Sequence, residues 1–180
     1  MSYPQSYPQS HPLSYPQDRY HGDTGEVSAR FRPADTPPEV SSADGANSTG
    51  YLATQLSTGG EFGLYKAQLG PRAGGPATHF HRAMSESFYI LSGELELFDG
   101  EHWVTGREGD FLYVPPGGLH AFKNVSDEPM SMLMLFAPGA PREEYFERVA
   151  EMTRRGGEEL KEFRVRHDSY FLEDFPGNVQ

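Results

Sequence analysis

Between Tyr51 and Ala137 the chain consists of short apolar runs separated by glycine and proline, and this pattern limits the fold more than any other feature. The runs cover residues 62–69, 88–91, 95–98, 111–114 and 130–136. They are too short for typical helices and are rich in aromatic and branched side chains, so they predict strands. Several short strands with turns at this spacing are typical of an all-β sandwich or barrel.

One of these turns is specified locally. Asp99-Gly100 lies between the run 95–98 and the run 102–104. Asp-Gly allows the positive φ angles of a type I′ turn, so the two runs predict a hairpin with a two-residue loop.

The segment before the barrel has a different composition. Residues 2–17 form four tandem tetrapeptides of the type Ser-Tyr-Pro-Gln, and the sequence to about Thr49 stays rich in Pro, Ser, Gly and Asp. Proline blocks helix formation. The segment has few large aliphatic side chains, and burying them cannot offset the entropy that the chain loses on ordering. We therefore predict a disordered tail over residues 1–49 and a barrel over 50–140. The repeats could be a docking ligand for a partner or a dispensable tail.

A helical extension is predicted over residues 141–180. Apolar residues recur at helical spacing from Glu143 to Met152, behind an acidic first turn, and Gly156-Gly157 ends the pattern. A second helix is expected from about Glu158 to His167. We expect both helices to pack on the outside of the barrel, and residues 170–172 to form a short strand or an anchor.

Composition excludes several classes of protein. The chain has no cysteine, so disulfides and thiolate metal sites are excluded and a metal would need nitrogen and oxygen ligands. Its net charge of −11 is opposite to that of a protein binding nucleic acid or an anionic membrane. No apolar run approaches the ~20 residues that span a bilayer. We expect a cytoplasmic protein without nucleic-acid or membrane partners.

Two stretches of sequence carry the candidate ligands. His79 and His81 are two residues apart, so on a strand they point to the same face. Glu86 has the other parity, so a bulge or turn through residues 83–85 must bring its carboxylate round. The second stretch supplies His120, which emerges just after a rigid reversal at residues 115–118, where proline fixes φ and glycine supplies unusual conformations.

These stretches resemble the two motifs of the cupin superfamily. The pattern G-x5-P-x-G-x2-H-x3-N is matched in full by Gly109, Pro115, Gly117, His120 and Asn124. The pattern H-x-H-x4-E-x6-G is matched by His79, His81, Glu86 and Gly93. The opening glycine of the first motif is displaced: Ala73 occupies the expected position, and Gly74 and Gly75 stand beside it.

The resemblance implies an all-β fold, a cupin β-barrel or double-stranded jelly roll with C-terminal helices. It also implies that His79, His81, Glu86 and His120 bind one divalent transition metal inside the barrel. Imidazole and carboxylate ligands suit Fe, Mn, Ni, Co, Zn or Cu, and the sequence leaves the identity open. Four protein ligands on a six-coordinate ion leave two positions for small molecules. Cupins commonly pair, so the resemblance further implies a homodimer.

The substrate pocket is predicted from strand parity. Phe88 shares the parity of Glu86, and Phe122 shares that of His120, so these two rings are the candidates to line a pocket for a planar aromatic ligand. The remaining histidines are expected to be solvated side chains: His11, His21, His102 and His167.

The site resembles those of small quercetin 2,3-dioxygenase-like cupins. This favours an enzyme, a metal-dependent dioxygenase acting on a small aromatic or enolisable substrate, with Glu86 as the catalytic acid–base group. Two alternatives stay open. One is a non-redox isomerase or polyketide cyclase-like cupin, and the other is a small-molecule-binding cupin without turnover.

Overall fold

The computed structural model describes residues 17–174, so most of the tetrapeptide repeat lies outside the described residues. The chain divides into two units, Met1–Arg32 and Pro33–Gln180. Residues 17–32 of the first unit contain no helix or strand and are almost entirely exposed. The second unit carries the whole of the described secondary structure and the candidate site.

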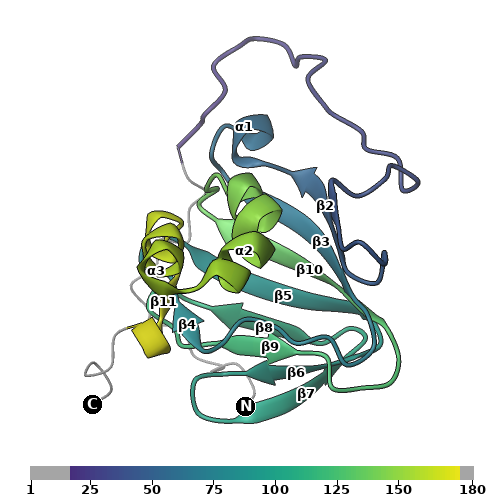
Figure 1. The fold of residues 1–180 in the computed structure, drawn as a ribbon. Helices are drawn as coiled ribbons and strands as arrows, with labels where there is room; N and C mark the ends of the chain where they lie inside the picture. The colour runs from purple at the N-terminus through teal and green to yellow at the C-terminus, as the bar shows by residue number, and fades with distance from the viewer. Residues whose placement is uncertain (1–16, 175–180) are drawn as a thin grey trace. The chain divides into compact units, whose positions relative to one another are not determined.

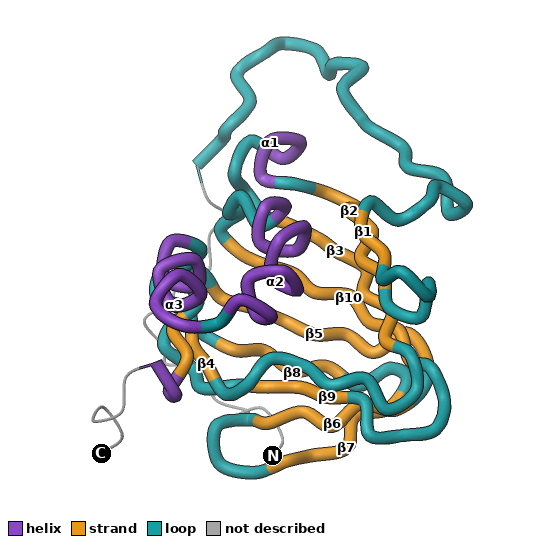
Figure 2. Tube along the Cα trace, viewed as in Figure 1, coloured by secondary structure: helices purple, strands orange, loops and turns teal. Residues whose placement is uncertain are grey.

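The second unit is built mainly from strands, with helices gathered to one side of them (Figures 1 and 2). The strands are β1 (Val40–Ser41), β2 (Ser48–Ala53), β3 (Gly63–Leu69), β4 (His79–Phe80), β5 (Ser85–Ser92), β6 (Glu94–Phe98), β7 (Trp103–Arg107), β8 (Phe111–Val114), β9 (Ala121–Lys123), β10 (Met130–Ala137) and β11 (Tyr170–Phe171). The helices are α1 (Gln55–Thr58), α2 (Glu143–Arg155) and α3 (Gly157–Arg166), followed by a 3₁₀ turn at Leu172–Asp174.

Antiparallel pairing organises these strands into sheets that face each other across the core. A six-stranded sheet has the order β1-β2-β3-β10-β5-β8, a three-stranded sheet has the order β7-β6-β9, and β11 pairs with β4. This is the all-β jelly roll with C-terminal helices that the sequence predicted.

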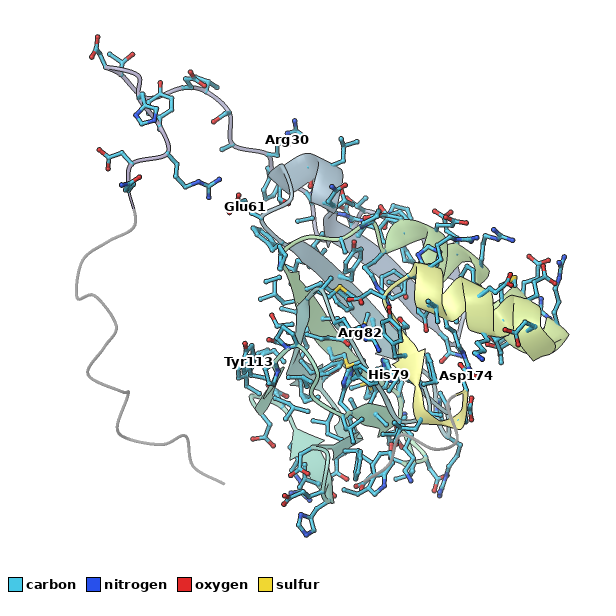
Figure 3. All side chains as sticks on the ribbon, turned by 90° about the vertical axis from the view of Figure 1, so that its left-hand side faces the viewer. Arg30, Glu61, His79, Arg82, Tyr113 and Asp174 are labelled. Atoms are coloured by element: carbon cyan, nitrogen blue, oxygen red, sulfur yellow. The ribbon has the colours of Figure 1, made fainter. Side chains whose placement is uncertain are left out.

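The core lies on one face of β10. Its side chains alternate strictly between buried and half-buried, and Met130, Met132, Met134 and Phe136 all point inward. Tyr113 on β8 is exposed and points outward, whereas His79 on β4 lies inside (Figure 3). The candidate ligand His79 is therefore placed on the inner side of the barrel.

The predicted boundary between tail and barrel at residue 49 is too late. β1 and the start of β2 already belong to the six-stranded sheet, in which Thr49 pairs with Val40 on one side and Ala67 on the other. A turn joins the two strands, and Asp44 stabilises it by accepting hydrogen bonds from Ser42 Oγ and the Ala46 N–H. Local polar contacts and sheet pairing order a segment whose composition alone indicates a disordered chain.

The predicted two-residue hairpin is also wrong in its loop length. β6 and β7 do pair, but the loop between them spans residues 99–102. The Asp99 carboxylate accepts the backbone N–H groups of Glu101 and His102, which stabilises the wider loop, while Gly100 adopts a φ of 102°.

The two C-terminal helices form where the sequence predicts them, but α2 does not simply cover the outside. Tyr145 and Phe146 on α2 line the same cavity as His79 and Glu86. The apolar face of α2 is therefore part of the wall of the site, because the barrel leaves its apolar interior open at this end.

Candidate metal centre

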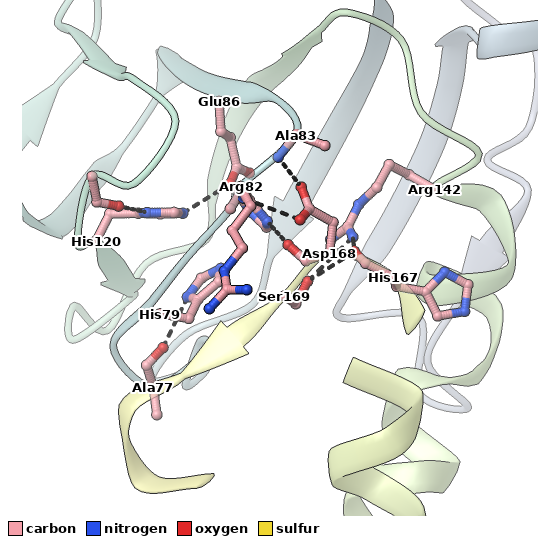
Figure 4. A network of polar contacts seen from close by, with 12 residues as sticks. Ala77, His79, Arg82, Ala83, Glu86, His120, Arg142, His167, Asp168 and Ser169 are labelled. Atoms are coloured by element: carbon pink, nitrogen blue, oxygen red, sulfur yellow. Dashed lines mark hydrogen bonds and ion pairs between the residues drawn. The ribbon is translucent and has the colours of Figure 1, made fainter. Parts of the chain in front are cut away.

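Four side chains converge inside the barrel, and they are the four that the sequence predicts as ligands. One ligand atom from each of His79, His81, Glu86 and His120 lies within 4.8 Å of every other. Each of these residues is at most 4% exposed. Figure 4 shows this group with its surrounding polar contacts.

An interruption between strands β4 and β5 brings the Glu86 side chain to the same side as the histidines. β4 ends at Phe80 and β5 begins only at Ser85, so the strand is interrupted where the parity of Glu86 requires it. The Asp168 carboxylate supports this break by accepting the backbone N–H groups of Arg82 at 3.0 Å and Ala83 at 2.8 Å. The expected turn is therefore present, and its support comes from the far end of the chain.

The reversal before His120 works as the sequence predicts. Gly117 adopts a φ of 83°, a conformation that side chains rarely tolerate, and its N–H donates to the His81 carbonyl at 2.7 Å. The backbones of His120 and His79 then exchange two hydrogen bonds of 3.0 Å. The tight turn thus fixes one histidine directly opposite another.

Asn124, the last residue of the second motif, has a structural role. It is 2% exposed, and its amide donates to the carbonyls of Gly70 and Glu128 at 2.8 Å. Its Oδ1 accepts from Ser126. The amide ties together the loops behind the site and does not join the ligand cluster.

The hydrogen bonds of the imidazoles favour a cation at the centre. The Nδ1 atoms of His79, His81 and His120 each face a backbone carbonyl, of Ala77, Asp168 and Gly118 respectively. A carbonyl only accepts, so each Nδ1 carries the hydrogen and a neutral ring directs the Nε2 lone pair inward.

The Nε2 atoms of His81 and His120 lie 3.0 and 2.9 Å from Glu86 Oε2. The two Nε2 lone pairs and the carboxylate oxygen are all hydrogen-bond acceptors. They can lie this close only if protons or a metal ion lie between them. Three neutral imidazoles and a carboxylate fit a divalent transition metal.

The electrostatics of Glu86 and His79 agree with ligand chemistry, whereas at His120 burial lowers the pKa but the hydrogen bond and charge of Glu86 outweigh it and raise this pKa. Burial alone would raise the pKa of Glu86, but the hydrogen bonds and charges of His120 and His81 outweigh it and hold this pKa well below its usual range. Burial lowers the pKa of His79 well below its ordinary value. Glu86 is therefore ionised and His79 neutral near pH 7, which are the forms that bind metal.

Strand β11 forms a second layer behind the site. Phe171 pairs with His79 across the β4–β11 ladder, and its buried ring stacks on the His79 imidazole with a centroid distance of 4.7 Å and an angle of 9°. The Arg164 Cζ atom lies 3.8 Å from the centre of the same ring. The predicted short strand at residues 170–172 thus helps to orient a ligand.

A cavity of about 630 Å³ opens onto the cluster. His79, Glu86 and Phe122 contribute to its wall, so one of the two predicted pocket rings lines it. Phe88 is 1% exposed and packs in the core, 5.5 Å from the Phe122 ring and 6.0 Å from the His120 ring. Phe88 therefore supports the wall from behind.

The displaced glycine of the first motif has a steric reason within this wall. A Cβ atom at Gly75 would lie 1.8 Å from the Phe122 carbonyl oxygen, whereas one at Gly74 would meet nothing within 4 Å. Gly75 therefore allows the close backbone contact that places Phe122 against the cavity.

Sequence reasoning missed three residues around the site: Arg142, Asp168 and Phe171. Asp168 follows the end of α3 with a φ of 54°, and Arg142 immediately precedes α2. Neither position has a spacing pattern that points to the ligands. His167 was expected to be solvated, but it is only 9% exposed, because it packs on the Phe163 ring at 4.6 Å.

Residues 66–136 match the family model described as Cupin domain. This chain contains a cupin domain. The matched range includes all four candidate ligands, and the motif residues predicted from the sequence lie within it. Among the described residues, no helix combines the length and the apolar character needed to cross a membrane.

The cupin domain has curated relatives with different names. It is 27% identical over 88 residues to "Quercetin 2,3-dioxygenase" of Bacillus subtilis (strain 168), and 33% identical over 87 residues to "Polyketide synthase CurC" of Streptomyces cyaneus. These matches cover 49% and 48% of this chain, but 26% and 54% of the relatives. The chain thus spans only about a quarter and about half of their lengths.

A solved structure supports the fold. An RmlC-like cupin from Shewanella frigidimarina NCIMB 400 aligns with a TM-score of 0.52 and 20% sequence identity. The alignment covers 65% of this chain and 96% of the other. The cupin domain therefore has the architecture of that protein.

Proposed function

We propose that this protein is a metal-dependent dioxygenase acting on a small aromatic or enolisable substrate. The observation that carries the proposal is the cluster of four buried candidate ligands, two of which, His79 and Glu86, line a cavity of about 630 Å³. A cavity of this size suits a small molecule. The similarity to a protein named quercetin 2,3-dioxygenase supports the oxygenase chemistry.

The cavity wall is suited to a flat, largely apolar ligand. Its aromatic members come from four elements, β9, β10, α2 and β11: Phe122, Phe136, Tyr145, Phe146 and Phe171. Such rings can hold a planar substrate by stacking or edge contacts and keep water away from it. Substrate position would then be determined by this wall and by the ligand cluster beside it.

The metal, when bound by His79, His81, Glu86 and His120, would supply Lewis acidity and redox chemistry at its open positions. Glu86 has the second role in the proposal. Its carboxylate is ionised at neutral pH, because His120 and His81 lower its pKa. The ionised carboxylate would accept a proton from an acidic substrate hydroxyl, such as that of an enolisable phenol, because its own low pKa makes it a weak base. The product would be the enolate or phenolate that reacts.

The test loads the metal-free protein separately with Fe, Mn, Ni, Co or Cu and measures oxygen consumption with flavonols and other enolisable phenols. We expect consumption with at least one metal. Glu86→Gln should lower the rate by roughly 100-fold or more if the carboxylate moves the proton. His102→Ala, a change at an exposed loop histidine, is the matched control. Absence of oxygen uptake by protein with bound metal would contradict the proposal.

A non-redox cyclase or isomerase is the second candidate. The observation that favours it is the 33% identity to "Polyketide synthase CurC". The same cavity and the same Glu86 proton acceptor would serve it without oxygen. Turnover of an aromatic or enolisable substrate under anaerobic conditions by the zinc-loaded protein would support this candidate over the dioxygenase.

A further inference from the structure

Arg142 is a buried cation at the wall of the cavity. It is 3% exposed, and the cavity wall that includes His79 and Glu86 also includes Arg142. Its guanidinium lies near three aromatic rings of the same wall, with Cζ 4.1 Å from the centre of Tyr145, 5.1 Å from that of Phe136 and 5.8 Å from that of Phe146. The aromatic faces stabilise the cation only in part.

The hydrogen bonds of Arg142 leave its charge uncompensated. Nη1 donates to the His167 carbonyl and to Ser169 Oγ, which are both neutral groups. Nε is buried and has no hydrogen-bond partner. Among the described residues, no carboxylate forms an ion pair with this guanidinium. A buried charge without a counter-ion is costly and therefore unusual.

Arg164 gives a comparison within the same unit, because its Nε is also buried without a hydrogen-bond partner. It is also buried, at 7% exposed, but its Nη1 contacts Glu173 at 2.9 Å and Asp174 at 3.0 Å. Both arginines belong to the wall of the cavity. The protein thus supplies carboxylates to one of them and leaves the other available to a ligand.

A single short segment holds Arg142 and the metal site together. The His167 carbonyl and Ser169 accept from Arg142, while the Asp168 carbonyl between them accepts from His81 Nδ1 (Figure 4). The Phe136 ring lies next to both Arg142 and His81. Its centre is 5.1 Å from Arg142 Cζ and 6.1 Å from the centre of the His81 ring. A small ligand beside the cluster would therefore meet the guanidinium as well.

We propose that Arg142 binds the anionic group of the cavity's ligand, and that this ligand is a small organic carboxylate. Guanidinium is the protein group best shaped to hold a carboxylate. The cavity wall contains two acidic residues, Glu86 of the ligand cluster and the exposed Glu147 on α2. The proposal deepens the proposed function, on which it rests for the place of the substrate, by narrowing the substrate class to acids.

The test compares benzoate with benzamide, a neutral molecule of the same shape, by calorimetric titration of the zinc-loaded protein and of the chelator-treated protein. The wild type should bind benzoate more tightly in both forms. Arg142→Gln should weaken benzoate binding roughly tenfold to 100-fold and leave benzamide within about twofold. Arg142→Lys should retain part of the preference, and Arg155→Gln, at an exposed arginine later on α2, should retain all of it.

Two results would overturn the proposal. One is a wild type that binds benzoate no more tightly than benzamide, and this comparison stands even if Arg142→Gln does not fold. The other is a folded Arg142→Gln that binds benzoate as the wild type does. A benzoate preference that depends on Arg142, together with no oxygen uptake, would remove the dioxygenase proposal and leave this one intact.

Discussion

The two sides of the metal centre are built in different ways. On the motif side, three candidate ligands lie within residues 79–86, and a turn of glycine and proline directs the fourth, as at Gly117 before His120. On the C-terminal side, Asp168 and Phe171 support the ligands from the end of the chain, with Asp168 and His81 87 residues apart in sequence. The comparison teaches that ligand identity is a local property here, whereas ligand orientation depends on long-range contacts.

The largest expected effect is the loss of a ligand on the motif side. His120→Ala removes one of the four converging donors and the contact of 2.9 Å between His120 Nε2 and Glu86 Oε2. Metal content after dialysis, measured by elemental analysis, should fall to background while circular dichroism shows a folded barrel. His102→Ala should keep its full metal content. A stoichiometric metal in His120→Ala would remove this residue from the ligand set.

A smaller loss is expected from Asp168, on the C-terminal side. Asp168→Gly tolerates the φ of 54° but removes the acceptor for the N–H groups of Arg82 and Ala83, which support the break before Glu86. Metal affinity, measured by competition with a chelating dye, should fall roughly tenfold to 100-fold. Asp168→Asn keeps one acceptor oxygen and should lose less. Equal affinities in all three proteins would show that the motif side orients its ligands unaided.

Phe171→Leu tests the aromatic support of His79. Leucine keeps most of the buried volume but removes the stacked ring at 4.7 Å, so the free energy of unfolding should fall by less than about 1.5 kcal/mol. Urea denaturation gives this value, and the metal affinity should fall less than it does in Asp168→Gly. A fall as large as that of Asp168→Gly would place the main C-terminal support in the ring.

The smallest effect is expected on the outer face of the same strand pair. The Arg82 guanidinium lies 4.2 Å from the centre of the Tyr170 ring and is exposed. Arg82→Gln should therefore lower the free energy of unfolding by only about 0.5–1 kcal/mol. Metal content should stay at the wild-type level. A loss of metal would mean that the outer face of β4 and β11 also controls the site.

Much of this organisation can be predicted from sequence, because it depends on local chemistry. The strands at residues 63–69, 111–114 and 130–137 follow from short branched and aromatic runs, and α2 follows from its apolar spacing. The N-terminal boundary could not be predicted in the same way. The segment around Asp44 is ordered because β2 pairs with β3 and because Asp44 stabilises the turn before β2. Neither contact can be predicted from amino-acid composition.

The sequence alone indicated the barrel, through its short strands and turns, and the four candidate ligands, through their resemblance to the two cupin motifs. Only the tertiary structure decided what surrounds them. Asp168, Phe171 and Arg142 reach the site through pairing of β11 with β4 and packing of α2 against the cavity. Such contacts depend on how distant segments meet, and a buried, uncompensated charge becomes visible only when all its neighbours are known.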